Sequence, residues 1–228
     1  MNKVMDHIAF IPARKGSKGF PEKNVIFFDL TADFIDQIGW FNRVLVSSND
    51  EKVIEKAKSR KYEIIERSEE LSGSTVSIKE VIKDASKKIQ PTNQSIIWLF
   101  YIPILFKEDS HFNEVKKIIE KKSIKSIISF LPAETHPYNC WQIHESRITQ
   151  YVKNNVYRRQ DLPKAWYYHH YICSFNLSVL DQLDNELMNE ETYPYLLDEM
   201  TREKIVEIDT PLDLEKWKDI NRKSRKIK

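Results

Sequence analysis

Short apolar runs of strand length alternate with amphipathic helical patterns along this chain, and this alternation constrains the fold more than any other feature. The apolar runs are rich in Val, Ile and Phe, which is typical of strands covered on both faces; they span residues 7–13, 43–48, 63–66, 95–101, 126–131 and 204–209. The helical patterns between them have apolar residues three and four positions apart and span 50–60, 77–89 and 112–121. This order predicts an α/β fold with a mostly parallel, twisted sheet flanked by helices.

Residues 133–165 interrupt the alternation. They are rich in Tyr, Trp, His, Pro and Asn, and they contain two pieces of alternating pattern around residues 144–157. We interpret the stretch as an insertion, with a hairpin, that covers either the site or a partner subunit. The sequence shows neither internal repeats nor a low-complexity linker, so we expect residues 1–228 to form one domain that carries this insertion.

The charge balance argues against general binding to nucleic acids. The chain has 36 Lys and Arg residues and 34 Asp and Glu residues, for a net charge of +2, whereas nucleic-acid-binding domains usually show a concentrated basic excess. No apolar run approaches the roughly 18 residues of a membrane span, and no secretory pattern opens the chain. Cys140 and Cys173 lack metal-ligand spacing. We therefore expect a cytoplasmic protein with reduced thiols that binds neither nucleic acid nor a membrane.

A segment rich in glycine and cations follows the first predicted strand. Residues 11–24 read IPARKGSKGFPEKN and hold two of the four glycines, Gly16 and Gly19. A chain so poor in glycine places it where the backbone bends sharply or approaches a ligand closely. A tight loop at the carboxyl end of a strand, with free N–H groups and several cations, suits a triphosphate. The cations here are Arg14, Lys15, Lys18 and Lys23. The alternative is a solvated basic turn, and the segment is not a Walker A loop.

Two carboxylates lie near the end of the chain. Glu207 and Asp209 are two positions apart in the last predicted strand, so both side chains face the same way. Such a pair near phosphates suits Mg²⁺ or another divalent cation, and the alternative is a pair of solvent-facing acids on an edge strand. The residues that follow predict a helix start, with Thr210 as N-cap and Pro211 in the first position.

Residues 11–24 closely resemble the N-terminal signature of the acylneuraminate (CMP-sialic acid) cytidylyltransferase family. Further segments resemble that family in the same order: VLVSSND at 44–50, ERSEELSGSTVS at 66–77, THPYNCW at 135–141, RRQDLP at 158–163 and EIDTPLDLEKW at 207–217. The resemblance spans nearly the whole chain. It implies a Rossmann-like nucleotidyltransferase fold, an inserted dimerisation or lid segment, a homodimer, and transfer of a cytidylyl group from CTP to a small acidic sugar.

The resemblance also implies roles for single residues. The residues that it assigns to the nucleotide are Ala13, Arg14, Gly16, Ser17, Lys18, Lys23, Asn24, Arg67 and Ser77. Three of these, Arg14, Lys18 and Lys23, would be catalytic because they stabilise charge on the phosphates. The residues assigned to the acid acceptor are His136, Arg159, Gln160 and His169, and those assigned to the metal are Glu207 and Asp209.

Three segments depart from the family pattern. Residues 27–40 are shorter and lack a Gly-Lys-Pro-Leu stretch. Residues 99–106 read LFYIPILF where the family has Gln-Pro-Thr-Ser-Pro-Leu, so the polar nucleotide contacts expected there are missing. His169, His170 and Tyr171 replace an Asn-Gly-Ala near the sugar acid, and Glu207 stands where Asp is usual. These departures leave open a different acceptor, or a non-catalytic nucleotide-binding relative.

Overall fold

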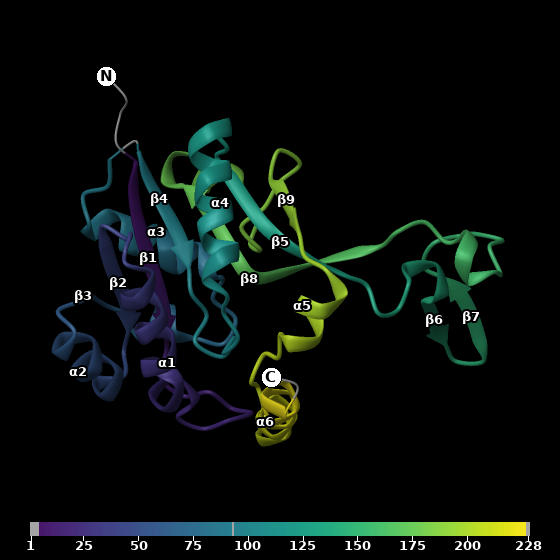
Figure 1. Cartoon of the computed structure of the whole chain (residues 1–228), viewed down its shortest axis with the longest axis horizontal. Helices are drawn as coiled ribbons and strands as arrows, with labels where there is room; N and C mark the ends of the chain where they lie inside the picture. The colour runs from purple at the N-terminus through teal and green to yellow at the C-terminus, as the bar shows by residue number, and fades with distance from the viewer. Residues whose placement is uncertain (1–4, 93, 227–228) are drawn as a thin grey trace.

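A seven-stranded sheet forms the centre of the computed structural model, which describes residues 5–92 and 94–226 (Figure 1). Its strand order is β3-β2-β1-β4-β8-β5-β9. β8 runs antiparallel to its neighbours β4 and β5, and the other adjacent strands are parallel, so the predicted mostly parallel α/β sheet is confirmed. The strands are β1 (Asp6–Ala13), β2 (Arg43–Ser48), β3 (Glu63–Glu66), β4 (Ser95–Leu99), β5 (Ser126–Pro132), β8 (Trp166–Asn176) and β9 (Tyr193–Leu196).

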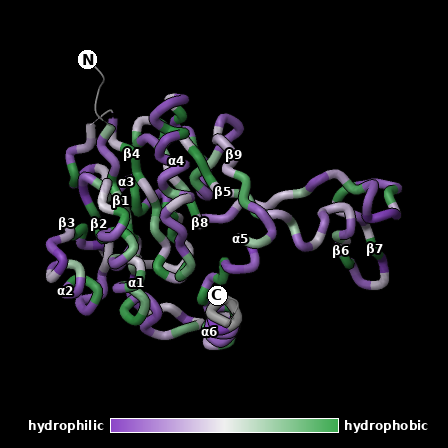
Figure 2. The backbone as a smooth tube through the Cα atoms, in the orientation of Figure 1, coloured by the Kyte–Doolittle hydropathy of each residue, from purple (hydrophilic) through white to green (hydrophobic). Residues whose placement is uncertain are grey.

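Helices cover both faces of this sheet. On one face, Phe28, Ala57 and Val115 join a core with β1 and β4; they come from α1 (Lys23–Ile38), α2 (Glu51–Ser59) and α4 (Asp109–Lys122). On the other face, Val81 and Ile82 of α3 (Ile78–Lys88) pack against the alternate residues of the same strands. Figure 2 shows hydrophobic residues along the central strands, as the apolar runs of the sequence predict.

The predicted helix starts have the side-chain caps that their sequences call for. The Asp50 carboxylate accepts a hydrogen bond from the Lys52 N–H at the start of α2. Ser77 and Glu80 form a reciprocal capping box at the start of α3. The predicted cap of α6 (Pro211–Lys226) is also present, because Thr210 Oγ1 accepts from the Asp213 N–H over 3.4 Å, and Asp213 Oδ2 in return accepts from the Thr210 N–H over 2.7 Å.

The sequence was wrong about one strand and missed two. Residues 204–209 do not form a strand: α5 (Glu199–Lys204), capped by Asp198, ends there, and only an isolated bridge joins Ile104 to Glu207. β8 is also absent from the predicted strands, and its run of eleven residues is rich in aromatic side chains. β9 was missed because it is short and contains Pro194, which lowers strand propensity.

Residues 133–165 leave the sheet between β5 and β8 as an arm (Figure 1). The arm carries a two-stranded hairpin of β6 (Trp141–His144) and β7 (Arg147–Gln150), which lies nearer the N-terminus than the predicted 144–157. It projects away from the sheet of its own chain. Among residues 5–92 and 94–226, none of the helices combines the length and the apolar character that crossing a bilayer requires.

Candidate active site

The loop after β1 turns sharply at its first glycine. Gly16 has a φ of +82°, in the left-handed region that glycine enters without steric cost. The Asn24 Nδ2 atom donates a hydrogen bond to the Arg14 carbonyl oxygen over 2.9 Å and so ties the start of α1 to the start of the loop. The Arg14 Nη1 atom donates to the Gly16 carbonyl oxygen over 3.3 Å. The loop therefore holds its cations in a defined turn at the carboxyl end of a central strand.

The second loop glycine packs against the segment that carries the acidic pair. A Cβ atom at Gly19 would lie 2.5 Å from the carbonyl oxygen of Asp209, a separation that real Cβ atoms essentially never show. Glycine is therefore required at this position for the two segments to touch. The sequence predicted that these glycines mark a sharp bend or a close approach to a ligand. Gly16 makes the bend, and the close approach of Gly19 is to protein backbone.

A cation and a carboxylate from distant parts of the chain meet beside this contact. The Lys23 Nζ atom lies 2.5 Å from Asp209 Oδ1 and 3.2 Å from the carbonyl oxygen of Ile208. Val206 and Ile208 are buried, whereas Glu207 and Asp209 are exposed. Both carboxylates therefore face the same side, as predicted, although the segment is extended chain and not a strand.

The Glu207 carboxyl lies in an environment that disfavours its charge. Partial burial raises its pKa, and the negative charge of Asp209 raises it further. The positive charge of Lys23 offsets part of this cost, and in the part of the chain that the structure describes no hydrogen bond to the Glu207 side chain adds to this offset. A cation bound between the two carboxylates would relieve their repulsion.

These groups line one cavity of about 480 Å³, which we call the nucleotide cavity after the predicted role of its residues. The structure thus brings together the cation-rich loop and the acidic pair, as the sequence predicted, while the roles of the single residues stay predictions. The predicted nucleotide and metal residues in the cavity wall are Arg14, Ser17, Lys18, Lys23, Asn24, Arg67, Glu207 and Asp209.

Three residues predicted for nucleotide binding lie outside this wall. Ala13 is buried at the end of β1, and its carbonyl oxygen accepts a hydrogen bond from Ser48 Oγ over 2.6 Å. Gly16 shapes the turn of the loop. The Ser77 hydroxyl accepts from the Glu80 N–H and caps α3. The contacts of these residues are with protein, not with the cavity.

Arg67 brings a buried cation to the cavity. Its side chain is largely covered, and its Nε atom donates to the carbonyl oxygen of Leu71 over 2.7 Å. Burial lowers its pKa, and the positive charge of Arg14 lowers it further. No carboxylate pairs with its guanidinium among the residues described. A buried cation without an acidic partner is suited to an acceptor oxygen on a ligand.

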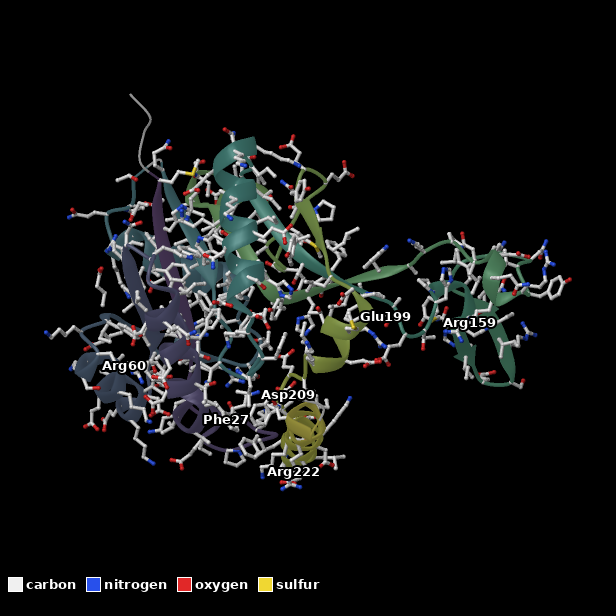
Figure 3. All side chains as sticks on the ribbon, viewed as in Figure 1. Phe27, Arg60, Arg159, Glu199, Asp209 and Arg222 are labelled. Carbon is white, nitrogen blue, oxygen red and sulfur yellow. The ribbon has the colours of Figure 1, made fainter. Side chains whose placement is uncertain are left out.

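The residues predicted for the acid acceptor lie elsewhere. His136 and Arg159 line a second cavity of about 840 Å³ at the base of the arm. Gln160 belongs to the short 3-10 turn Arg159–Asp161 and is not part of that wall. Figure 3 shows Arg159 on the arm and Asp209 beside α6, well apart from each other. Within one chain, the predicted acceptor residues are therefore separate from the nucleotide cavity.

His169 lines neither of these two cavities. Its Nδ1 atom accepts a hydrogen bond from the Tyr171 N–H over 3.0 Å, where the pairing of β8 with β5 shifts between Ile128 and Ser129. Burial lowers the pKa of His169 to about 4, and the charge of the neighbouring His170 contributes to this lowering. The ring is therefore neutral at pH 7 and supports the irregular backbone of β8.

Sequence reasoning missed much of the apolar wall of the nucleotide cavity. These lining residues are Pro12, Val76, Ile78, Tyr101 and Pro103. Apolar side chains carry no chemical signal of their own, although Val76 and Ile78 flank the predicted Ser77. Only the pairing of β4 with β1 brings Tyr101 to the cavity, and a sequence does not state strand order.

The fold defines the class of the protein. The structure is similar to that of CMP-2-keto-3-deoxy-manno-octonic acid synthetase complexed with CTP, with a TM-score of 0.68 and 12% identity over 96% of this chain and 99% of that one. It is also similar to 4-diphosphocytidyl-2C-methyl-D-erythritol synthase from Anaerococcus prevotii, with a TM-score of 0.61 and 14% identity over 95% of this chain and 99% of that one. At these identities the likeness concerns the fold, which is a Rossmann-like nucleotidyltransferase fold.

The sequence comparison identifies the family. Residues 8–224 match the Cytidylyltransferase family, and the chain belongs to it. N-acylneuraminate cytidylyltransferase of Streptococcus agalactiae serotype V is 25% identical over 216 residues, which are 90% of this chain and 51% of the relative. Pseudaminic acid cytidylyltransferase of Campylobacter jejuni subsp. jejuni serotype O:2 is 29% identical over 175 residues, 72% of this chain and 75% of the relative. The chain thus spans about half the length of the streptococcal relative.

Proposed function

We propose that this chain transfers the cytidylyl group of CTP to an ulosonic, sialic-type acid and releases pyrophosphate. The observation that carries the proposal is the single cavity in which the cation-rich loop meets the acidic pair. Membership of the Cytidylyltransferase family supports the reaction type. The names of the relatives, which refer to N-acylneuraminate and pseudaminic acid, support an acidic sugar as the acceptor.

In the proposed reaction, an oxygen of the acceptor attacks the α-phosphorus of CTP. The bond between that phosphorus and the oxygen bridging to the β-phosphate breaks, and the acceptor proton is lost to water. For a sialic-type acid the attacking group is the anomeric hydroxyl. Negative charge develops on the leaving pyrophosphate, and the cations that would stabilise it are Arg14, Lys18 and Lys23.

Glu207 and Asp209 would hold the divalent cation, for which we propose Mg²⁺. Within the described ranges, no cluster of three or more His, Cys, Asp or Glu side chains could hold a metal ion. A metal at this pair would thus take further ligands from phosphate oxygens and water, as Mg²⁺ commonly does. The two carboxylates fit this requirement, because they face one cavity and repel each other. Bound Mg²⁺ would supply positive charge at the phosphate oxygens.

We further propose a homodimer in which the arm of each copy reaches the nucleotide cavity of the other. The hairpin exposes large apolar side chains: Ile143 is 75% exposed and Ile148 is 65% exposed, and the two pair across the strands. Exposed apolar groups on a projecting arm suit a contact surface. This pairing would bring Arg159 of one copy to the cavity of the other, where its guanidinium could bind the acceptor carboxylate. His136 would support the arm, because its two ring nitrogens are hydrogen-bonded to the Tyr138 N–H and the Pro163 carbonyl oxygen.

Incubation with each of the four nucleoside triphosphates, Mg²⁺ and a panel of ulosonic acids tests the proposal. We expect pyrophosphate release with CTP and a sialic-type acid, and a CMP-sugar identified by its mass. Release with CTP and a different acceptor favours a cytidylyltransferase that acts on another acceptor, an alternative that the altered segment 169–171 motivates. CTP binding that raises the melting temperature, with no pyrophosphate from any acceptor, favours a non-catalytic relative. If CTP has no effect at all, the result contradicts the proposed reaction and both of its alternatives.

A further inference from the structure

Tyr101 reaches the nucleotide cavity from the end of β4, the strand next to β1. Its ring packs against the hydrophobic cores on both faces of the sheet. It also contacts the ring of His170 edge-on, with the centroids 5.4 Å apart. The ring is therefore held in place by protein contacts, and its orientation does not depend on its hydroxyl.

The Tyr101 hydroxyl is a polar group that the protein leaves uncommitted. No hydrogen bond joins it to another residue in the described part of the chain. Burial raises the pKa of the phenol, and the nearby Cys173, Glu186 and Glu207 add to this, so the group keeps its proton and can both donate and accept. A partly buried hydroxyl without a protein partner is satisfied by water or by a ligand in the cavity.

The cavity wall holds two chemically different sets of residues. The phosphate loop contributes charged and polar groups such as Lys18 and Lys23. The apolar set is Val76, Ile78 and Pro103, which line the wall together with Tyr101 and the buried guanidinium of Arg67. Apolar walls with a few polar tips fit a nucleoside, whose base has apolar faces and a polar edge. A phosphate or an acidic sugar would instead require several cations.

We infer that the Tyr101 hydroxyl hydrogen-bonds the nucleoside part of the bound nucleotide, so that Tyr101 determines nucleotide affinity in this chain. The inference rests on the proposed function for the identity of that nucleotide. It also amends the expectation from the sequence that polar contacts are missing at residues 99–106. The segment reads as apolar, but the sheet brings one side chain with a polar group, that of Tyr101, to the cavity wall.

Tyr101→Phe tests this, because it removes one oxygen and keeps the ring that packs in the core. The dissociation constants of CTP and of inorganic tripolyphosphate are measured by calorimetry for both proteins. We expect the constant for CTP to rise about 5- to 10-fold, as for the loss of one hydrogen bond. The constant for tripolyphosphate should stay the same, because that ligand has no nucleoside.

Tyr195→Phe is the matched control. The Tyr195 hydroxyl donates to Glu114 over 2.8 Å and does not line the cavity, so its loss should leave CTP binding unchanged. The inference is overturned if Tyr101→Phe binds CTP within twofold of the wild type, or if CTP and tripolyphosphate weaken equally. A wild-type protein that binds tripolyphosphate but not CTP contradicts the proposed function itself, and so the two failures are distinguishable.

Discussion

Single residues in the nucleotide cavity differ in how far their charges are already committed to protein partners. Lys23 is paired with Asp209, which fixes the loop against the acidic segment. Lys18 is exposed in the cavity wall and forms no ion pair within the described ranges. Lys18 is thus the loop lysine whose charge is free to meet an incoming phosphate, whereas Lys23 has a second role in assembling the site.

Lys18→Ala should nearly abolish turnover. The loss of one group that stabilises developing charge costs about 100- to 1000-fold in kcat, which steady-state pyrophosphate release with CTP would measure. Lys15→Ala is the matched control, because Lys15 lies in the same loop but outside the cavity wall. Turnover of Lys18→Ala at the rate of the wild type would contradict the phosphate assignment.

Gly19→Ala should separate the loop from the acidic segment. The new Cβ atom would meet the Asp209 carbonyl oxygen at 2.5 Å, so one of the two segments must shift. A displacement of about 1 Å at a catalytic site can cost roughly 100-fold in rate. Gly73→Ala serves as the control, since its Cβ would have no contact shorter than 3.4 Å. Equal activity of the two variants in the pyrophosphate assay would show that the Gly19 contact is dispensable.

At the scale of elements, α1 fixes the position of the cation-rich loop that precedes it. It begins at Lys23 and is held to α2 by ion pairs from Arg60 to Asp29, Asp33 and Asp36. Lys56 adds a further pair with Asp29. Side-chain pairs between two helices limit how far α1 can rotate, and with it the loop that precedes it.

Asp29 should make the stability of this helix pair depend on pH. Partial burial alone would raise its pKa, but hydrogen bonds and charges from Lys56 and Arg60 lower it below the usual 3.8. The stabilisation is therefore fully present above pH 3.8 and is lost as the pH falls through the lowered folded value. Because Asp29 is 45% exposed, screening limits its contribution to roughly 0.5 to 1 kcal/mol.

Urea unfolding of Asp29→Asn at pH 7 and at about pH 2.5 measures this contribution. The variant should be less stable than the wild type at pH 7, and this deficit should shrink at the lower pH, where more of the wild-type carboxyl is protonated. Glu203→Gln is the control, since Glu203 forms no ion pair in the part that the structure describes. A deficit of Asp29→Asn that persists unchanged in acid would mean that charge is not its cause.

On the scale of the whole molecule, the body and the arm divide the predicted site between them. The body carries the nucleotide cavity, and the arm carries Arg159 and six of the thirteen large hydrophobic residues that are exposed in the described part of the chain (Figures 1 and 3). An arm that projects away from its own sheet cannot bring Arg159 to that cavity within one chain. The division is the structural reason for proposing a dimer.

Mixing two inactive variants tests this division. Arg159→Ala should remove acceptor binding and Asp209→Ala the metal site, so each homodimer loses both of its sites. If the arm of one copy completes the cavity of the other, a mixed dimer has one intact site. Exchange of subunits should then restore roughly a quarter of the wild-type rate, because half of the dimers are mixed. Light scattering measures the mass of the dimer. If mixed dimers form and the mixture still stays inactive, the shared site is contradicted.

The sequence predicted much of the fold and of the site. The first five strands, the capped helices α2 and α3, and the cap of α6 follow from local patterns. The motif at residues 11–24 and the acidic pair at 207 and 209 also carried their own chemical signals. By contrast, nothing local revealed β9, whose four residues are stabilised as a strand by pairing with β5, or the role of the His169 ring in β8.

The sequence by itself determined the properties that depend on neighbours in the chain: apolar periodicity, helix caps, the turn at Gly16 and the charges of the loop. What only the tertiary structure decided depends on residues far apart in the chain. The contact of Gly19 with Asp209, the arrival of Tyr101 in the cavity and the distance of Arg159 from it are examples. The physical reason is that strand order and the direction of the arm are set by which apolar surfaces bury one another, and this is a property of the assembled molecule.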